Sequence, residues 1–427
     1  MSTTIEQMRE VLPGYYNIRF GEPEYTDWMD ESTSWKETCY IGDWSFLWQR
    51  WFRGPDALKL FSDISVNGFS NFEIGQSKHV IHCNTNGKVI HEGILSRFGD
   101  EEFLLFGRGC FWADYKLRHG TYNATSEADD WFVYQVSGPK SLVLMETLLG
   151  ESLRDVGFMR FRPIAIAGHD VFALRQGMAG EVGFEIQGPR HLGPAIYDAV
   201  FEAGRAFGMR RMGARVASIN HLEACFPTIV MDYLPAIYDA DMEDYLAEFE
   251  SAMPAFAKTA KVGGSFDGTG PADYYRSPVE LGWAKSIRFD HDFLGRAALE
   301  AEMADPRRTI RTLVWDPQDV ADVQASLFRK DGRPYPFMDM PRDQRSLLSA
   351  DKVLRDGAVV GVSTSRGYSY TFREMLSLCV IDVDHAAIGT EVDVVWGAPG
   401  GPQKTIRARV APAPYKQDNR RLDLARL

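Results

Sequence analysis

The pattern of apolar residues changes once along this chain, near residue 306. Beyond that point short runs rich in Val, Ile and Thr follow one another with turn residues between them and almost no helical periodicity: "RRTIRTLVWD", "VVGVSTSRGYSY", "MLSLCVIDVD", "TEVDVVWG" and "KTIRARVAPAP". Short strands at such spacing are typical of a barrel or of a jelly-roll-like sandwich. The sequence therefore predicts an all-β C-terminal domain over residues 306–427.

Residues 1–305 mix helical and strand patterns instead. Two amphipathic helices are predicted in "PKSLVLMETLLGESL" and "GPAIYDAVFEAGRAFG", while "HVIHCNTNGKVIHEGILSRFGDEEFLLFGRG" reads as three strands separated by Asn-Gly and Gly-Asp turns. Hairpins interleaved with helices favour α+β layers over a doubly wound parallel sheet. We expect two α+β subdomains here, with mixed or antiparallel sheets, because the region exceeds the usual size of one domain.

Charge and cysteine content restrict the partners and the compartment. The chain has 47 basic and 59 acidic side chains, a net charge of −12, which argues against nucleic acid as a partner. Its five cysteines form no CxxC pair, as in proteins of a reducing compartment. No signal peptide and no membrane-length apolar run is recognised. We expect a cytoplasmic protein with no membrane contact, and nothing in the sequence indicates an obligate protein partner.

Common catalytic motifs are missing from the sequence. There is no HExxH, no GxSxG elbow and no GxGxxG opening a helix, and "GGSFDGTG" lacks the Lys-Ser/Thr of a phosphate-binding loop. His79 and His82 in "KHVIH" have no carboxylate beside them in the sequence, so we interpret them as strand residues and predict no metal site.

One carboxylate has an unusual position. In "RQGMAGEVGFEIQGP" (175–189), Glu185 lies between Phe184 and Ile186, and strand alternation points it away from both. Such a side chain is either solvated or held in a pocket where it accepts hydrogen bonds from a ligand. Glu181, in the preceding turn, is expected to be solvated.

This segment resembles the "TGYTGExGxEI" stretch of the glycine-cleavage T-protein superfamily. Other similar stretches follow in the same order and cover nearly the whole chain: "GPDALKLFSD", "NGKVIHEGIL", "GARVASINHLEA", "FDHDFLGRAALE" and "GVSTSRGYSY". The resemblance implies T-protein-like folate-binding domains followed by a C-terminal β-barrel, and tetrahydrofolate as the one-carbon acceptor.

Positions where this chain differs from the superfamily motifs indicate which branch of the superfamily it resembles. T-proteins have a D-x-S-H-M stretch, whereas this chain keeps Asp43 and Ser45 but has Phe46 in place of the histidine. It has His91 and Glu92 where T-proteins have paired aspartates, and it lacks the K-G-C-x-x-G-Q motif of the iron–sulfur assembly branch. The stretches "RQGMAGEVGFEI", "LPAIYDAD" and "KSIRFDHDFLGRAALE" are instead similar to the tetrahydrofolate-dependent aryl O-demethylases of the vanillate and syringate type.

The resemblance implies roles for four residues toward the folate. Glu185 would accept two hydrogen bonds from the pterin edge, and Glu223 in "HLEAC" matches the L-E-A of the family. Tyr275 and Trp283 are candidates to stack on the aminobenzoyl ring; a buried aromatic cluster is the alternative.

Three residues are candidates for chemistry at the aryl ether. Tyr238 stands where the resembling enzymes have their key tyrosine, and its reference pKa of about 10 matches a phenol leaving group; alternatively it only covers a core edge. Arg108, which ends the strand "EEFLLFGR", would hold a carboxylate or phenolate, or else face water. Tyr16 in "PGYYNIRF" matches a further active-site tyrosine.

Aromatic residues after the first predicted strand would line the substrate pocket. Trp44 and Phe46 are either core residues or the wall of an apolar aryl site, and Asp43 is either a helix cap or catalytic. The resemblance thus implies transfer of a methyl group from a methoxylated aromatic acid to tetrahydrofolate. The alternatives are a sulfonium or methylamine demethylase, and a non-catalytic folate-binding assembly or regulatory protein.

Overall fold

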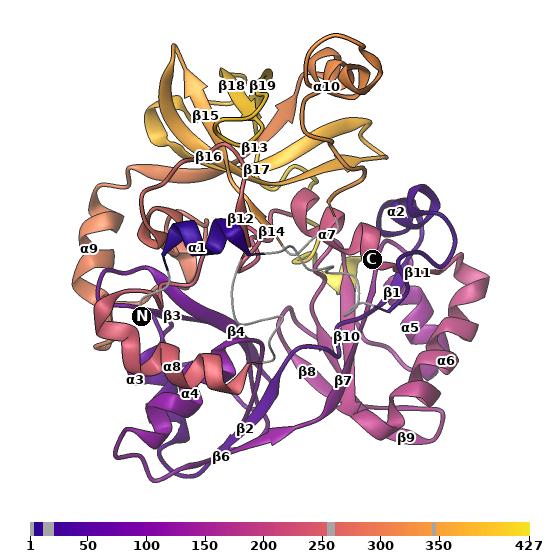
Figure 1. The fold of residues 1–427 in the computed structure, drawn as a ribbon. Helices are drawn as coiled ribbons and strands as arrows, with labels where there is room; N and C mark the ends of the chain where they lie inside the picture. The colour runs from indigo at the N-terminus through magenta and orange to yellow at the C-terminus, as the bar shows by residue number, and fades with distance from the viewer. Residues whose placement is uncertain (1–3, 12–20, 254–260, 344–346) are drawn as a thin grey trace.

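Two layers of helix and sheet lie beneath a closed β-barrel in a computed structural model of the chain (Figure 1). The structure describes residues 4–11, 21–253, 261–343 and 347–427. The predicted site residue Tyr16 lies outside the described residues. The α+β architecture with a β-barrel, expected from the sequence, is confirmed.

The first layer is an antiparallel sheet of five strands with the order β3-β4-β5-β2-β6. Its strands are β2 (Gln49–Arg53), β3 (Ser77–Cys83), β4 (Val89–Arg97), β5 (Glu102–Phe106) and β6 (Thr125–Asp129). Three helices share its apolar core, namely α3 (Ala57–Ile64), α4 (Gly109–Arg118) and α8 (Glu243–Ala252). The three strands predicted from "HVIHC" onwards are β3, β4 and β5.

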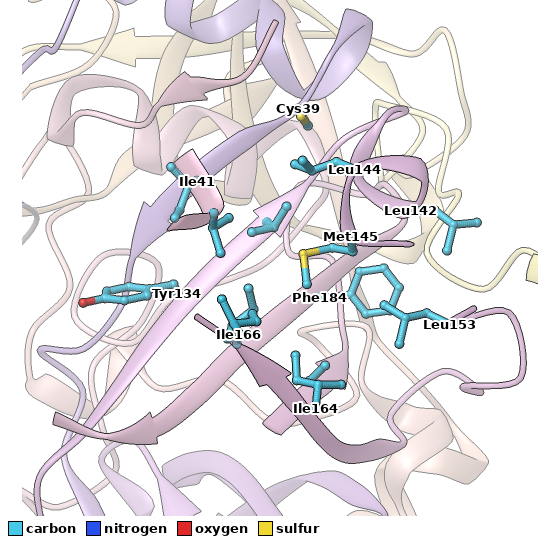
Figure 2. Close-up of a cluster of buried hydrophobic side chains, with 14 of the residues drawn as sticks. Cys39, Ile41, Tyr134, Leu142, Leu144, Met145, Leu153, Ile164, Ile166 and Phe184 are labelled. Carbon is cyan, nitrogen blue, oxygen red and sulfur yellow. The ribbon is translucent and has the colours of Figure 1, made fainter. Parts of the chain in front are cut away.

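The second layer is a sheet of six strands with the order β11-β1-β7-β10-β9-β8, antiparallel except for the pair β1 and β11. Its strands are β1 (Tyr40–Asp43), β7 (Trp131–Ser137), β8 (Phe161–Ile166), β9 (His169–Arg175), β10 (Gly183–Pro189) and β11 (Arg210–Arg211). One face packs on α5 (Ser141–Leu149) and α6 (Gly193–Gly204), the two predicted helices. Figure 2 shows part of this core, which includes Phe184 of β10, Met145 of α5 and Ile166 of β8.

The C-terminal barrel closes because β13 pairs with β17 on one side and with β19 on the other. This closure decides between the barrel and the sandwich. The barrel order is β13 (Arg308–Trp315), β17 (Glu374–Asp382), β16 (Ala358–Ser369), β15 (Asp351–Arg355), β18 (Glu391–Trp396) and β19 (Lys404–Ala411). The sequence pattern missed one helix, α10 (Pro317–Ala325), which Asp316 caps through the backbone N–H groups of Gln318 and Asp319.

The remaining elements connect the layers to the barrel. These are α1 (Ile5–Glu10), α2 (Trp28–Glu37), α7 (Ala214–Glu223), β12 (Lys261–Gly263), α9 (Arg296–Ala304) and β14 (Leu347–Ser349). The helix α7 lies between the second sheet and the barrel in Figure 1, and β12 pairs in parallel with β14. No helix within the described ranges is both long and apolar enough to cross a membrane.

Candidate functional site

Glu185 lies on the face of the second sheet that is turned away from the α5–α6 core. Its neighbours Phe184 and Ile186 are fully buried in that core, as strand alternation requires. In the ladder, Glu185 is opposite Gln135 of β7, and Gln135 is opposite Gly42 of β1. The predicted direction of the Glu185 side chain is therefore correct.

The Glu185 carboxylate is buried and has few polar neighbours. Only 8% of the residue is exposed, and the Gln135 amide donates a hydrogen bond to Oε1 at 3.4 Å. The Tyr40 hydroxyl donates in turn to the Gln135 Oε1 atom. Burial raises the pKa of Glu185 to about 7, against the hydrogen bond from Gln135, which lowers it. The solvated interpretation of Glu185 is wrong.

Several polar atoms around Glu185 are buried without a hydrogen-bond partner in the part of the chain described. They are Gln176 Oε1, Gln187 Nε2, Asn220 Oδ1 and His221 Nε2. Gln187 lies two residues beyond Glu185 on the same strand face, and the backbone N–H of Gln176 donates to the Gly183 carbonyl oxygen. Buried polar atoms normally have partners, so this group is typical of a site that a ligand completes.

Tyr238 occupies a second buried region, against the first sheet. Its backbone N–H donates to Tyr275 Oη at 3.1 Å, and the Tyr275 hydroxyl donates to Asp239 Oδ1 at 3.2 Å. Burial raises the pKa of Tyr238 to about 12, against the nearby positive charge of Arg108, which lowers it. Tyr275 therefore fixes the backbone next to Tyr238; its stacking on an aminobenzoyl ring stays a prediction.

Arg108 directly precedes α4 and lies near Tyr238; the strand β5, which we expected to end at Arg108, ends at Phe106. The Arg108 guanidinium carbon is 5.8 Å from the centre of the Trp48 ring. Burial raises the pKa of Tyr245, an effect that the charge of Arg108 opposes, whereas burial and the charge of Arg108 both lower the pKa of His91. Both residues are buried and have side-chain polar atoms without a described partner. The structure therefore brings Arg108 and Tyr238 together, two residues that are 130 positions apart in the sequence.

A histidine–carboxylate pair in the first sheet was missed by the sequence analysis. His79 Nε2 on β3 is 3.0 Å from Glu92 Oε2 on β4, and both side chains are largely buried. His79 is opposite Ile94, so Glu92 is its diagonal neighbour across the ladder. His79 has no carboxylate beside it in the sequence, but the register of the β3–β4 hairpin brings Glu92 next to it.

A cavity of about 630 Å³ lies next to this pair and reaches the second sheet. Its lining includes His79, Gln176 and Trp283. The Trp283 ring meets the His79 ring edge-on, with 4.8 Å between the ring centres. Trp283 therefore borders a cavity whose volume lies in the usual range for small-molecule sites. No cluster of three metal-ligating side chains occurs within the described ranges.

Trp44 and Phe46 belong to an apolar cluster between the two sheets. Trp44 is buried, and its ring lies 6.2 Å from the His221 ring at an angle of 30°. Burial lowers the pKa of His221 to about 4, with a contribution from the charge of Arg342, so this ring is neutral near pH 7.

Asp43 accepts a hydrogen bond from the Ser45 N–H in a turn. The interpretation of Asp43 as a helix cap is wrong, because the next element along the chain is the strand β2.

Glu223 is bound by other parts of the chain. Its carboxylate accepts hydrogen bonds from Trp35 Nε1 at 2.8 Å, Lys36 Nζ at 2.7 Å and Ser369 Oγ at 2.5 Å. It therefore joins α7 to α2 and β16. A contact between Glu223 and folate stays a prediction, and these three contacts give the residue a structural role.

Glu181 is buried, so its assignment as a solvated turn residue is wrong. Lys416 from the C-terminal tail forms an ion pair with it, and Asn419 Nδ2 donates a hydrogen bond at 2.8 Å. The partners come from more than 230 residues further along the chain. No local pattern in the sequence could have revealed them.

Comparisons with known proteins agree with this geometry. Residues 5–247 match the family model of the GCVT N-terminal domain, and residues 337–416 match the glycine cleavage T-protein C-terminal barrel domain. The solved structure of aminomethyltransferase T of the Bartonella henselae glycine cleavage system superposes with a TM-score of 0.69 at 17% identity, covering 97% of each chain. This likeness shows the fold.

Two relatives are similar over almost their whole length. The sesamin methylene transferase of a Sinomonas species is 35% identical, covering 94% of this chain and 92% of its own. The syringate O-demethylase of a Sphingobium species is 32% identical, covering 93% and 91%. The aminomethyltransferase of Thermotoga maritima is 21% identical, covering 92% of this chain and 90% of its own. The chain belongs to the glycine-cleavage T-protein family, in the branch that contains the aryl O-demethylase relative.

Proposed function

We propose that this chain demethylates a methoxylated aromatic acid and transfers the methyl group to N5 of tetrahydrofolate, forming 5-methyltetrahydrofolate and a phenol. The observation that carries this proposal is that Arg108 and Tyr238, both half-buried, lie close enough for the charge of Arg108 to lower the pKa of Tyr238 against the effect of burial. A guanidinium binds a carboxylate or phenolate well, and a neutral tyrosine donates a hydrogen bond to an ether oxygen. Arg108 in this region also disfavours a cationic substrate such as a sulfonium or a methylamine.

The second sheet has hydrogen-bonding groups that suit the pterin ring of the methyl acceptor. Two carboxylate oxygens of Glu185 match the two N–H donors of a reduced pterin edge, and the unpartnered atoms of Gln176 and Gln187 offer an acceptor and a donor beside them. Bound in this way, tetrahydrofolate supplies a nucleophilic amine. The sheet orients that amine, which lowers the entropic part of the barrier.

Tyr238 acts at the leaving oxygen. Since burial raises the pKa of Tyr238 to about 12, the hydroxyl stays protonated as the carbon–oxygen bond breaks. It therefore donates a hydrogen bond to the developing phenoxide, while the charge of Arg108 stabilises the same negative charge. The phenoxide then takes its proton from water.

The His79–Glu92 pair is assigned to the proton of the acceptor amine. When a methyl group leaves oxygen and bonds to a secondary amine, the amine becomes positively charged and must lose one proton. His79 accepts that proton, and Glu92, 3.0 Å away, stabilises the imidazolium. The pair borders the cavity that Trp283 also lines, so it stands on the acceptor side of the site.

A second candidate function is methylene transfer. The sesamin methylene transferase is slightly more similar to this chain than the demethylase is, at 35% against 32% identity. Transfer of a methylene group bridging two aryl oxygens breaks two carbon–oxygen bonds and removes two amine protons. Tyr238 and the His79–Glu92 pair provide two separate sites for these steps.

The test is incubation with tetrahydrofolate and two sets of substrates, methoxybenzoates and methylenedioxybenzenes, with the folate product identified by its mass. A 5-methyl product from the first set supports the proposal, and a 5,10-methylene product from the second supports the other candidate. No one-carbon folate from either set would favour a non-catalytic folate-binding protein.

The proposal also places the protein in the cytoplasm. Its five free cysteines, four of them buried, support a reducing compartment.

A further inference from the structure

Four buried side chains on the Glu185 face of the second sheet form a series of hydrogen bonds that begins on α7. Asn220 Nδ2 donates to Tyr40 Oη at 3.4 Å, and the Tyr40 hydroxyl donates to Gln135 Oε1. Gln135 Nε2 then donates to Glu185 Oε1 at 3.4 Å. Tyr40 lies two residues before Gly42, the register partner of Gln135, so it is the diagonal neighbour of Gln135 across the β1–β7 ladder.

This series of hydrogen bonds has one direction. An amide side chain donates at its NH2 end and accepts at its oxygen, so only the Gln135 oxygen can receive the Tyr40 proton. The Tyr40 oxygen accepts from Asn220, which leaves its own proton for Gln135. The NH2 group of Gln135 is thereby turned toward Glu185. An amide held the other way round would put its oxygen against Glu185, an arrangement that requires a protonated carboxyl group.

The orientation of Gln135 matters because Glu185 is buried. Burial raises the pKa of Glu185 to about 7, and the hydrogen bond from the Gln135 amide opposes that rise. Among the described residues, this amide is the one group that favours the charged form of Glu185.

Other titratable groups that the described elements bring to this face do not replace the amide. Burial raises the pKa of Tyr40 and lowers that of His221 on α7 to about 4, so both side chains are neutral near pH 7. Glu223, also on α7, is ion-paired with Lys36. The residue on β9 opposite the buried carboxylate is Leu174, which does not titrate.

We propose that Tyr40 is a positioning residue for folate binding: its hydroxyl holds the Gln135 amide so that Glu185 meets the pterin as a carboxylate. The inference rests on the proposed function, which assigns Glu185 to the pterin edge. Tyr40 itself need not touch the ligand. Without its hydroxyl the amide is free to turn over, and the empty site keeps the proton of Glu185 up to a higher pH. A pterin that needs an acceptor there must then displace that proton.

The test measures the affinity for tetrahydrofolate as a function of pH by titration calorimetry, with no aromatic substrate present. In Tyr40→Phe, we expect the fall in affinity toward low pH to begin about one pH unit higher than in the unmodified protein, because a hydrogen bond to a charged group is lost. The affinity should be about tenfold lower at about pH 6 and within about twofold at about pH 9, where Glu185 is charged in both proteins. A purely structural role would lower the affinity by the same factor at every pH.

A second variant tests whether Tyr40 acts through the amide. Gln135→Met removes the amide and keeps a side chain of similar length, so it should shift the pH dependence in the same direction. Adding Tyr40→Phe to Gln135→Met should then produce no further shift. Tyr134→Phe is the matched control, because it removes a buried tyrosine hydroxyl on the other face of β7, in the α5–α6 core, and should leave the pH dependence unchanged.

An unchanged pH dependence in Tyr40→Phe would overturn the inference while leaving the proposed function intact. The same is true of an equal loss of affinity at every pH, and of shifts that add up in the double variant. Failure of the unmodified protein to bind tetrahydrofolate at any pH would instead overturn the proposed function itself.

Discussion

A buried carboxylate such as Glu185 makes the stability of the free protein depend on pH. Burial raises the pKa from 4.5 to about 7, so the folded protein holds a proton between these values that the unfolded chain has released. The contribution of protonated Glu185 to the free energy of unfolding is complete below pH 4.5 and is lost as the pH rises from 4.5 to about 7. A ligand that donates hydrogen bonds to the carboxylate favours its charged form and reverses this effect.

Glu185→Gln should therefore flatten the pH dependence of stability and weaken folate binding. In the unmodified protein, we expect the free energy of unfolding to fall by about 3 kcal/mol as the pH rises from 4.5 to 7, because the pKa of Glu185 differs between the folded and unfolded states. Folate affinity should fall about tenfold per pH unit below pH 7, because binding requires the carboxylate. Urea unfolding and calorimetry across this range measure both quantities in the two proteins.

The same variant provides the control at high pH. Above pH 8, Glu185→Gln should be more stable than the unmodified protein when folate is absent and should bind folate about 2–4 kcal/mol more weakly. Unchanged folate affinity at every pH would remove Glu185 from the pterin site.

Tyr238→Phe should lower turnover by about 10²–10⁴-fold, the range for loss of a donor at a reacting oxygen. The ring and its packing are kept, so folding and folate affinity should not change. The loss should shrink for substrates with electron-withdrawing ring substituents, because their phenoxides need less stabilisation. Steady-state kinetics on a series of ring-substituted methoxybenzoates measures this dependence.

Tyr245→Phe is a matched comparison for Tyr238→Phe, since its hydroxyl is also buried near Arg108. A loss that is uniform across phenols of different acidity would mean that Tyr238 only positions the substrate. A larger loss in Tyr245→Phe than in Tyr238→Phe would transfer the role to Tyr245.

Among the elements, β1 depends on a close contact that only glycine permits. A Cβ atom at Gly42 would stand 2.1 Å from Cζ3 of Trp44, whose ring folds back over the strand. Gly42 is also in register with Gln135, which contacts Glu185. The strand and the turn after it thus place the Trp44 ring on the sheet face that also carries Gln135 and Glu185.

Gly42→Ala should displace the Trp44 ring. We expect a destabilisation of about 1–3 kcal/mol, the usual effect of overpacking a core. If Trp44 lines the aryl pocket, KM for the aromatic substrate should rise while folate affinity stays nearly unchanged. Urea unfolding followed by tryptophan fluorescence, together with kinetics, measures both.

Gly270→Ala is the control for this substitution, because a Cβ atom there meets no atom within 4 Å. It should leave stability and KM unchanged. A destabilised Gly42→Ala variant with an unaltered KM would assign Trp44 to the core alone.

At the scale of the whole molecule, the C-terminal tail returns from the barrel to the second sheet. Lys416 Nζ pairs with Glu181 and donates to the Gly180 carbonyl oxygen at 3.1 Å, and Arg175 on β9 donates to the carbonyl oxygens of Arg420 and Leu422. The tail thereby holds the turn that precedes β10, the strand of Glu185. The barrel and the second sheet are thus coupled through residues after Ala411.

Lys416→Met should destabilise the protein by about 3–5 kcal/mol, because it leaves the Glu181 carboxylate buried without its cation. Adding Glu181→Gln should recover much of that loss, since no uncompensated charge then remains. Denaturant unfolding of the single and double variants measures the coupling. Arg426→Ala, at an exposed tail residue, is the control; if it is equally destabilising, the effect does not arise from the ion pair.

A good part of the fold could be predicted from the sequence, because it depends on local patterns. Alternation placed Glu185 on the face opposite Phe184 and Ile186, turn residues separated β3, β4 and β5, and the strand-only region formed a barrel. The helix α10 was missed because its apolar face is short, with Val320 and Val323 as its buried residues. The domain boundary near residue 306 stays a prediction.

The candidate site was predicted less well, because its members meet through contacts that are distant in the sequence. The sequence by itself determined the residue types, their strand faces and the charge that disfavours nucleic acid. Only the tertiary structure paired His79 with Glu92, placed Arg108 beside Tyr238, and buried Glu181 and Glu223 against partners 146–238 residues away. The physical reason is that local periodicity fixes the direction of a side chain, whereas its partners, and hence its charge state, depend on how separate layers pack.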